Sequence, residues 1–108
     1  MELTKKSEAF LCIIYKEFIE RQKSGMPCSE ARNFEDGFHH NVDKLSEWNR
    51  CDMNECIAEL KNCGYIKCNI IGDIKLTDKA IIDMENRFKN NIKSIASTIK
   101  ELLSLIPF

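Results

Sequence analysis

The fold is decided by residues 52–80, which read DMNECIAELKNCGYIKCNIIGDIKLTDKA. A helix start is indicated at Asp52, because an acidic cap followed three residues later by Glu55 can satisfy the free amides of a first turn. Gly64 suits the left-handed residue that ends a helix. The apolar residues between them recur at helical spacing and form one stripe: Met53, Cys56, Ile57 and Leu60. We therefore predict a helix from Asp52 to Gly64.

The second half of this stretch predicts a β-hairpin. Residues 65–70 and 74–76 are rich in β-branched side chains and partly alternate in polarity, as strands do. The intervening Ile71-Gly72-Asp73 supplies turn residues. A helix followed directly by a hairpin, and then by a helix cap at Thr77 or Asp78, is the central signal of this chain.

Upstream, residues 4–23 predict a first helix. Phe10, Ile13, Ile14 and Phe18 share one helical face, and Gly25 and Pro27 end the pattern. Between the first helix and residue 52 the pattern is weaker. It indicates a short helix capped by Ser29 that runs through Ala31 and Phe34, and a further helix over residues 35–47 based on Phe38, Val42 and Leu45. The large aromatic Trp48 is expected to pack into the core.

Downstream, residues 78–106 predict a long helix. Its apolar residues alternate in steps of four and three: Phe88, Ile92, Ile95, Ile99, Leu102 and Ile106. As one continuous helix, residues 78–106 would span roughly 43 Å, more than so small a domain covers. We therefore expect this seam to form a homodimer interface, with packing against the chain's own core as the alternative. Asn90-Asn91 weakens helix propensity, so the sequence leaves open one helix or two.

This order of elements is typical of a winged helix-turn-helix. The expected class is mainly α with a small β-hairpin, in a single domain over residues 1–108. Residues 1–76 would supply the helices and the wing, and residues 77–108 a helical extension. At 108 residues the chain fits one core.

The chain resembles the YjcQ-like small winged-helix proteins of bacteria and their phages. The resemblance rests on Glu59-Leu60 with Gly64-Tyr65-Ile66, on Leu76-Thr77-Asp78-Lys79, and on residues 84–90, MENRFKN. Residues 14–17, 23–26 and 29–31 show a weaker similarity. The resemblance implies a DNA-binding type of fold, and it implies no catalytic group and no assigned activity.

The net charge and the length of the longest apolar run argue against some classes of function. The net charge is −1, so general attraction to nucleic acid or to anionic lipid is not expected. The longest apolar run, residues 9–15, is far shorter than the ~20 residues that cross a bilayer. It also lacks the features of a signal peptide. We expect a cytoplasmic chain without membrane contact.

The six cysteines predict free thiols. No pair has the C-x-x-C spacing that structural zinc favours, and an intracellular chain rarely forms disulfides. A zinc site that adds His39 and His40, and a nucleophilic Cys28 with His39 as base, are weaker alternatives. We find no phosphate loop, metal pair or carboxylate dyad, so we expect no enzyme activity, no metal and no cofactor.

Charge complicates the DNA-binding interpretation. Residues 25–64 carry four basic side chains against eight acidic ones, a net charge of −4. Contacts with phosphate groups supply much of the affinity of a protein for DNA, so this acidic stretch is poorly suited to bind the DNA backbone. If the chain binds double-stranded DNA, we expect Lys67 and Lys75 of the wing to contribute most of the affinity. The full set of expected DNA-contacting residues is Arg50, Asn54, Lys61, Lys67 and Lys75. The alternative is a protein-interaction module of phage or mobile-element origin, whose acidic helix meets a basic partner.

Overall fold

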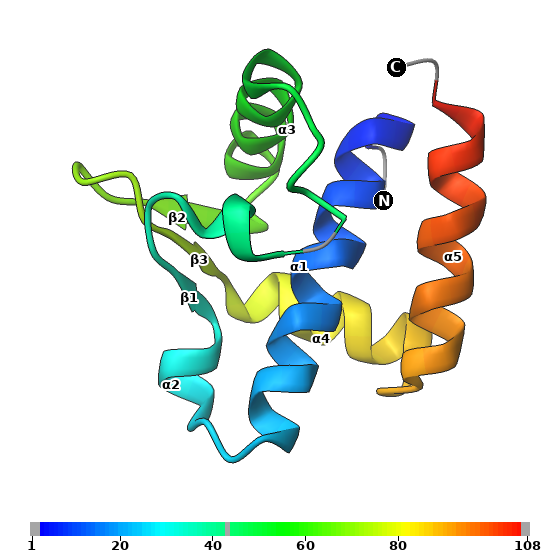
Figure 1. Cartoon of the computed structure of the whole chain (residues 1–108). Coiled ribbons are helices and arrows are strands. Elements are labelled where there is room, and N and C mark those ends of the chain that lie inside the picture. The colour runs from blue at the N-terminus through cyan, green and yellow to red at the C-terminus, as the bar shows by residue number, and fades with distance from the viewer. Residues whose placement is uncertain (1–2, 43, 107–108) are drawn as a thin grey trace.

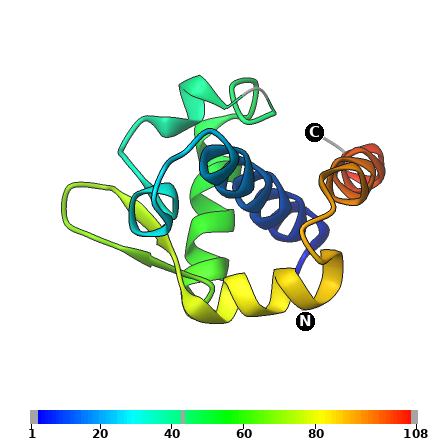
Figure 2. The same cartoon turned by 90° about the horizontal axis from the view of Figure 1, so that it is seen from below.

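Helix α1 forms the centre of the structure, and the other elements surround it (Figures 1 and 2). The computed structural model describes residues 3–42 and 44–106. In chain order these form α1 (Lys5–Lys23), α2 (Cys28–Ala31), β1 (Asn33–Phe34), a 3-10 helix η1 (Phe38–Asn41), α3 (Arg50–Asn62), β2 (Ile66–Cys68), β3 (Ile74–Leu76), α4 (Asp78–Phe88) and α5 (Ile92–Leu105). The molecule is therefore mainly helical with a small antiparallel sheet.

The predicted first helix is confirmed as α1. Thr4 caps it by accepting a hydrogen bond from the backbone N–H of Ser7 at 3.3 Å. Residues 9–15 are all buried, which requires cover on every side of the helix. Helix α3 packs on one side and α5 on another. Among the described residues, no helix has both the length and the hydropathy needed to cross a membrane.

The predicted hairpin is present and is part of a larger sheet. Strands β2 and β3 pair antiparallel with Lys67 opposite Lys75, and β1 pairs with the other edge of β3, which gives the order β1-β3-β2. The sequence did not predict β1. Phe34, which the sequence assigned to a short helix, lies opposite Ile74 in the sheet. The short helix itself is confined to α2 and follows Pro27.

The predicted helix over residues 35–47 is wrong. Gly37 has a φ of 84°, which is a left-handed backbone conformation, so a right-handed α-helix does not continue through this residue. In the described residues 38–42 and 44–48 the chain forms η1, bends and turns, yet Phe38, Val42 and Leu45 are buried as their spacing suggested. The spacing of the apolar residues thus predicted which side chains of this segment are buried, but it did not predict the backbone conformation.

Helix α3 begins earlier than predicted, because its cap lies three residues before the predicted cap Asp52. Its cap is Asn49, whose side-chain oxygen accepts from the N–H of Asp52 at 2.9 Å. Its end is as predicted, because Gly64 adopts a left-handed φ of 81°.

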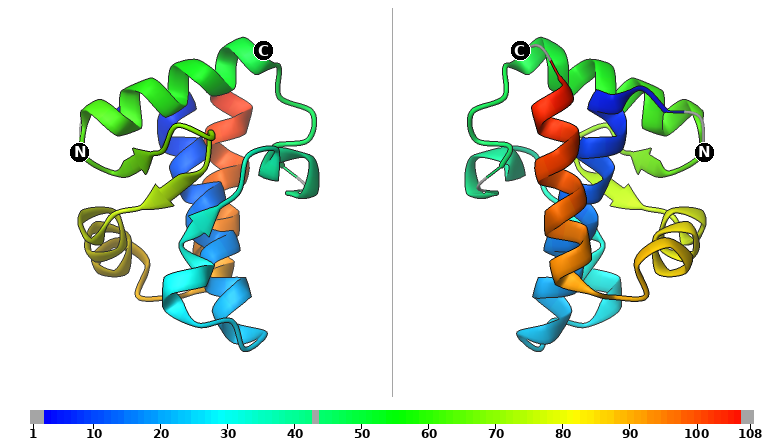
Figure 3. Two further views of the ribbon diagram at one scale, coloured as in Figure 1. Left: turned by 90° about the vertical axis from the view of Figure 1, so that its left-hand side faces the viewer. Right: turned by 90° about the vertical axis from the view of Figure 1, so that its right-hand side faces the viewer.

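The C-terminal stretch is two helices, which was one of the two alternatives. Lys89 and Asn90 both have positive φ, and this pair turns the chain between α4 and α5. The hydroxyl of the buried Tyr15 donates to Oδ1 of Asn90 at 2.8 Å, so α1 holds the turn. Helix α5 then runs back along α1 (Figure 3).

This turn removes the argument for a dimer based on helix length. Four of the six seam residues, Phe88, Ile95, Ile99 and Leu102, are buried in the chain's own core. Ile92 and Ile106 are partly buried and pack against it. The seam therefore faces the inside of its own domain, and a homodimer would need another surface.

The six cysteines carry free thiols in clearly different environments. Cys28 and Cys51 are exposed, whereas Cys12 and Cys56 are buried. Burial raises the pKa of Cys12 to about 12 and that of Cys56 to about 11. Since the thiolate is the reactive form, these two buried thiols are chemically inert in the folded chain.

We predict that iodoacetamide labels Cys28 and Cys51 in the native protein and leaves Cys12 and Cys56 unmodified. Peptide mass spectrometry after a short exposure at neutral pH would measure this. In denaturant all four should react at similar rates. Equal labelling of Cys12 under native conditions would contradict the packing of α1.

Candidate nucleic-acid interface

Helix α3 separates its charges into two stripes. Asp52, Glu55 and Glu59 follow one another at steps of three and four, so they share one side of the helix. This acidic stripe faces the start of α1. The ammonium of Lys6 lies 2.8 Å from Asp52 and 3.3 Å from Glu55, and the hydrogen bond to Asp52 raises the pKa of Lys6.

Glu59 completes the contact between α3 and α1. Its carboxylate accepts from the Ser7 hydroxyl at 2.7 Å, from the Thr4 hydroxyl at 2.8 Å and from the Thr4 N–H at 2.9 Å. Burial opposes ionisation of Glu59, but these hydrogen bonds outweigh it and hold the pKa of the carboxyl below its usual range. The acidic stripe thus links α3 to the start of α1 through ion pairs and hydrogen bonds, with Glu55 still largely exposed.

The other stripe of α3 carries the basic and amide side chains. Arg50, Asn54, Ile57 and Lys61 recur at steps of four, three and four, and the charged members of this basic stripe are both cations. Its first three residues line a recess of about 200 Å³ together with the hairpin residues Cys68, Gly72 and Ile74. The first three residues of the basic stripe therefore lie on the side of α3 that faces the β2–β3 hairpin, and Figure 3 shows this hairpin beside α3.

The two hairpin lysines, Lys67 and Lys75, lie on the opposite face of the hairpin. Successive side chains of a strand alternate between faces, so Lys67 and Lys75 point away from the face formed by Ile66, Ile74 and Leu76, which are buried. They line a hollow of about 160 Å³ with Arg32 and Asp78. A hydrogen bond from Arg32 at 2.7 Å lowers the pKa of Asp78, and Lys75 and Lys67 lower it further.

The structure therefore divides the five expected DNA contacts into two sets. Arg50 and Asn54 meet at the recess, and Lys61 lies on the same stripe of α3. Lys67 and Lys75 form a cross-strand pair on the outer face of the sheet. Sequence reasoning missed Arg32, which joins the outer set only because β1 brings the end of α2 beside β3: its Nε donates to the Leu76 carbonyl at 2.9 Å.

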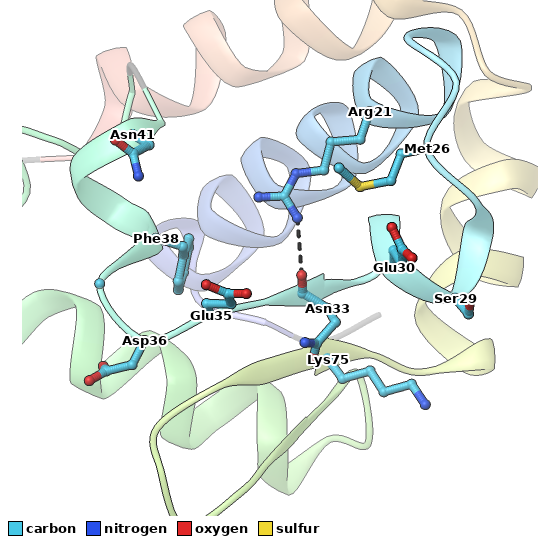
Figure 4. Close-up of a pocket in the computed structure, with 11 residues that line it drawn as sticks. Arg21, Met26, Ser29, Glu30, Asn33, Glu35, Asp36, Phe38, Asn41 and Lys75 are labelled. Carbon is cyan, nitrogen blue, oxygen red and sulfur yellow. Dashed lines mark hydrogen bonds between the residues drawn. The ribbon is translucent and has the colours of Figure 1, made fainter.

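A larger groove lies elsewhere, between the end of α1 and β1 (Figure 4). It measures about 550 Å³ and mixes acidic, basic and apolar side chains. Its central cation, Arg21, is already engaged: the guanidinium donates to the Asn33 carbonyl at 3.0 Å and stacks on Phe34 at 4.3 Å. Arg21 covers the free edge of β1, so a structural role accounts for it.

Within the described ranges, no group of three or more His, Cys, Asp or Glu side chains is placed to hold a metal ion. The chain matches no family model, no curated protein and no solved structure.

Proposed function

We propose that this chain is a winged helix-turn-helix protein that binds double-stranded DNA through the basic stripe of α3. The observation that carries the proposal is the separation of charge on this helix. Counted along the sequence, α3 and its surroundings are acidic, but the acids of α3 are engaged with α1. The stripe beside the wing presents Arg50, Asn54 and Lys61.

The arrangement of elements supports the same proposal. A helix that packs against α1 and is followed by a hairpin, with a first strand that pairs to give the order β1-β3-β2, agrees with the layout proposed for a winged helix. In this layout α3 is the recognition helix, and η1 with its flanking turns replaces the second helix. Asn54 lies in the first half of α3, where an amide can pair with the edge of an adenine in the major groove.

The protein-interaction alternative depends on a free acidic surface on α3. Asp52 and Glu59 of that surface are tied to α1, and only Glu55, whose side chain is 71% exposed, remains largely open. The geometry thus favours a DNA partner over a basic protein partner.

The test is fluorescence anisotropy with a labelled duplex at low salt. We expect weak binding of random-sequence DNA that declines steeply as salt rises. Arg50→Ala with Lys61→Ala should lower the slope of log K against log salt by about two, roughly one unit for each lost phosphate contact.

The matched control is Lys93→Ala with Lys100→Ala. Both lysines are exposed on α5, and the change in net charge is the same. This variant should keep the wild-type slope. Equal losses in the two variants would mean that only bulk charge matters, and an absence of wild-type binding at low salt would contradict the proposal itself.

A further inference from the structure

The tip of the wing carries an unusual apolar feature. Ile70 is fully exposed, and Ile71 is 75% exposed. They are consecutive residues at the end of the β2–β3 hairpin, which extends away from the body of the molecule (Figure 1). Two neighbouring isoleucines held in water at a protruding tip indicate a contact surface.

The tip is held by several hydrogen bonds. The side-chain oxygen of Asn69 accepts from the N–H groups of Gly72 at 3.0 Å and of Asp73 at 2.9 Å, and the N–H of Asn69 donates to the Asp73 carbonyl. Asp73 in turn accepts from the N–H of Asp36 at 2.8 Å, which ties the turn to the segment after β1. A tip fixed in this way can present its apolar side chains without a large loss of entropy.

Cations flank the hairpin on both sides. Arg50 of the basic stripe lines the recess on one face, and Lys67 and Lys75, with Arg32 beside them, line the hollow on the other. A hairpin tip that enters a DNA groove lies between two phosphate backbones, so both of its faces meet negative charge. An apolar tip with Arg50 on one face and three cations on the other fits this position.

Asp36 and Asp73 are the acidic side chains near the tip. Both oxygens of Asp73 accept hydrogen bonds, one from the Asp36 N–H and the other from the Asn69 amide at 3.3 Å. The Asp36 carboxylate lies against Gly72, where a Cβ would approach it to 3.0 Å. These two carboxylates thus lie at the joint between the hairpin and the segment after β1, whereas Ile70 and Ile71 occupy the outer end.

From these observations we infer that the wing tip enters the minor groove and that Ile70 and Ile71 wedge against a base step and bend the duplex. This inference rests on the proposed function, since α3 must occupy the neighbouring major groove. Apolar side chains inserted from the minor groove partly unstack the bases and kink DNA toward the major groove. The favoured sites should contain TA or CA steps, which kink most easily.

The test compares wild type with Ile70→Ser combined with Ile71→Ser. The DNA probe is a duplex with a central TA step, labelled at both ends for energy transfer, and anisotropy is recorded on the same samples. We expect the variant to bind about tenfold more weakly and to lose the bend that wild type produces. Its thermal unfolding should match wild type, because neither side chain is buried.

The matched control is Ile82→Ser with Leu105→Ser, two apolar side chains that are 55% and 59% exposed on α4 and α5. It should bind and bend DNA like wild type. If the tip variant also binds and bends DNA like wild type, the wedge is overturned while the proposed function stands. The wedge is overturned as well if the only effect of the tip variant is to dissolve a dimer of the chain. If wild type binds no DNA, both proposals fail.

Discussion

Replacing Ile95 and Leu102 with aspartate in the same chain is expected to unfold the protein rather than to separate two folded copies. Ile95 is fully buried and Leu102 is 5% exposed, and both lie on the face of α5 that covers α1. Each change removes a buried apolar side chain, at about 2–5 kcal/mol, and also places a carboxyl group in an apolar site. Together these losses reach the ~5–15 kcal/mol that stabilises a typical domain.

Circular dichroism during thermal unfolding measures the effect. Ala96→Asp with Ser97→Asp adds the same charge to the exposed side of α5 and should leave the transition close to wild type. Folded monomers of the Ile95/Leu102 variant beside a wild-type dimer would show instead that the seam joins two chains. Sedimentation of wild type at micromolar concentration also tests whether a dimer forms through another surface.

The elements that the sequence predicted correctly are those with local signals. Thr4 and Thr77 cap α1 and α4 through contacts three residues away, and Gly64 ends α3 by its own backbone conformation. The hairpin likewise depends on a turn whose hydrogen bonds join residues 69 and 73. Such signals are contained in a short window of sequence.

The break between α4 and α5 shows where local information becomes insufficient. Asn90-Asn91 lowered helix propensity but did not decide between one helix and two. The decision involves Tyr15, which lies 75 residues away and donates to the side chain of Asn90. A contact of this kind is set by tertiary packing, which periodicity does not describe.

Local sequence information was also insufficient to predict the candidate interface. Counted along the chain, the charges of residues 25–64 sum to −4, which argues against DNA. This count could not show that Lys6, 46 residues from Asp52, engages the acidic stripe, or that Arg50 and Asn54 of the basic stripe face the β2–β3 hairpin. The spacing of the two stripes was nevertheless present in the sequence, at steps of three and four.

Phe34→Ala is expected to destabilise the chain by about 3–5 kcal/mol, because the loss of a large aromatic side chain would leave a cavity in a packed core. Phe34 is fully buried, its ring centre lies 5.3 Å from that of Phe38, and Arg21 stacks on it at 4.3 Å. Strand β1 has only two residues, so local propensity contributes little to it. The packing of Phe34 is what holds β1 beside β3, and this is why the strand was invisible in the sequence.

In thermal unfolding, Phe34→Ala should lower the midpoint by roughly 15 °C or more. Phe34→Leu retains most of the buried volume and should recover much of this loss, whereas Glu35→Ala changes the exposed neighbour and should leave the midpoint nearly unchanged. The outcome matters for the β2–β3 hairpin, because Asp36 lies two residues after this strand and its backbone N–H donates to the Asp73 carboxylate at the hairpin turn. A stable Phe34→Ala variant with increased helical ellipticity would mean that residues 35–47 can form the helix their apolar period suggested, and that β1 is dispensable for the fold.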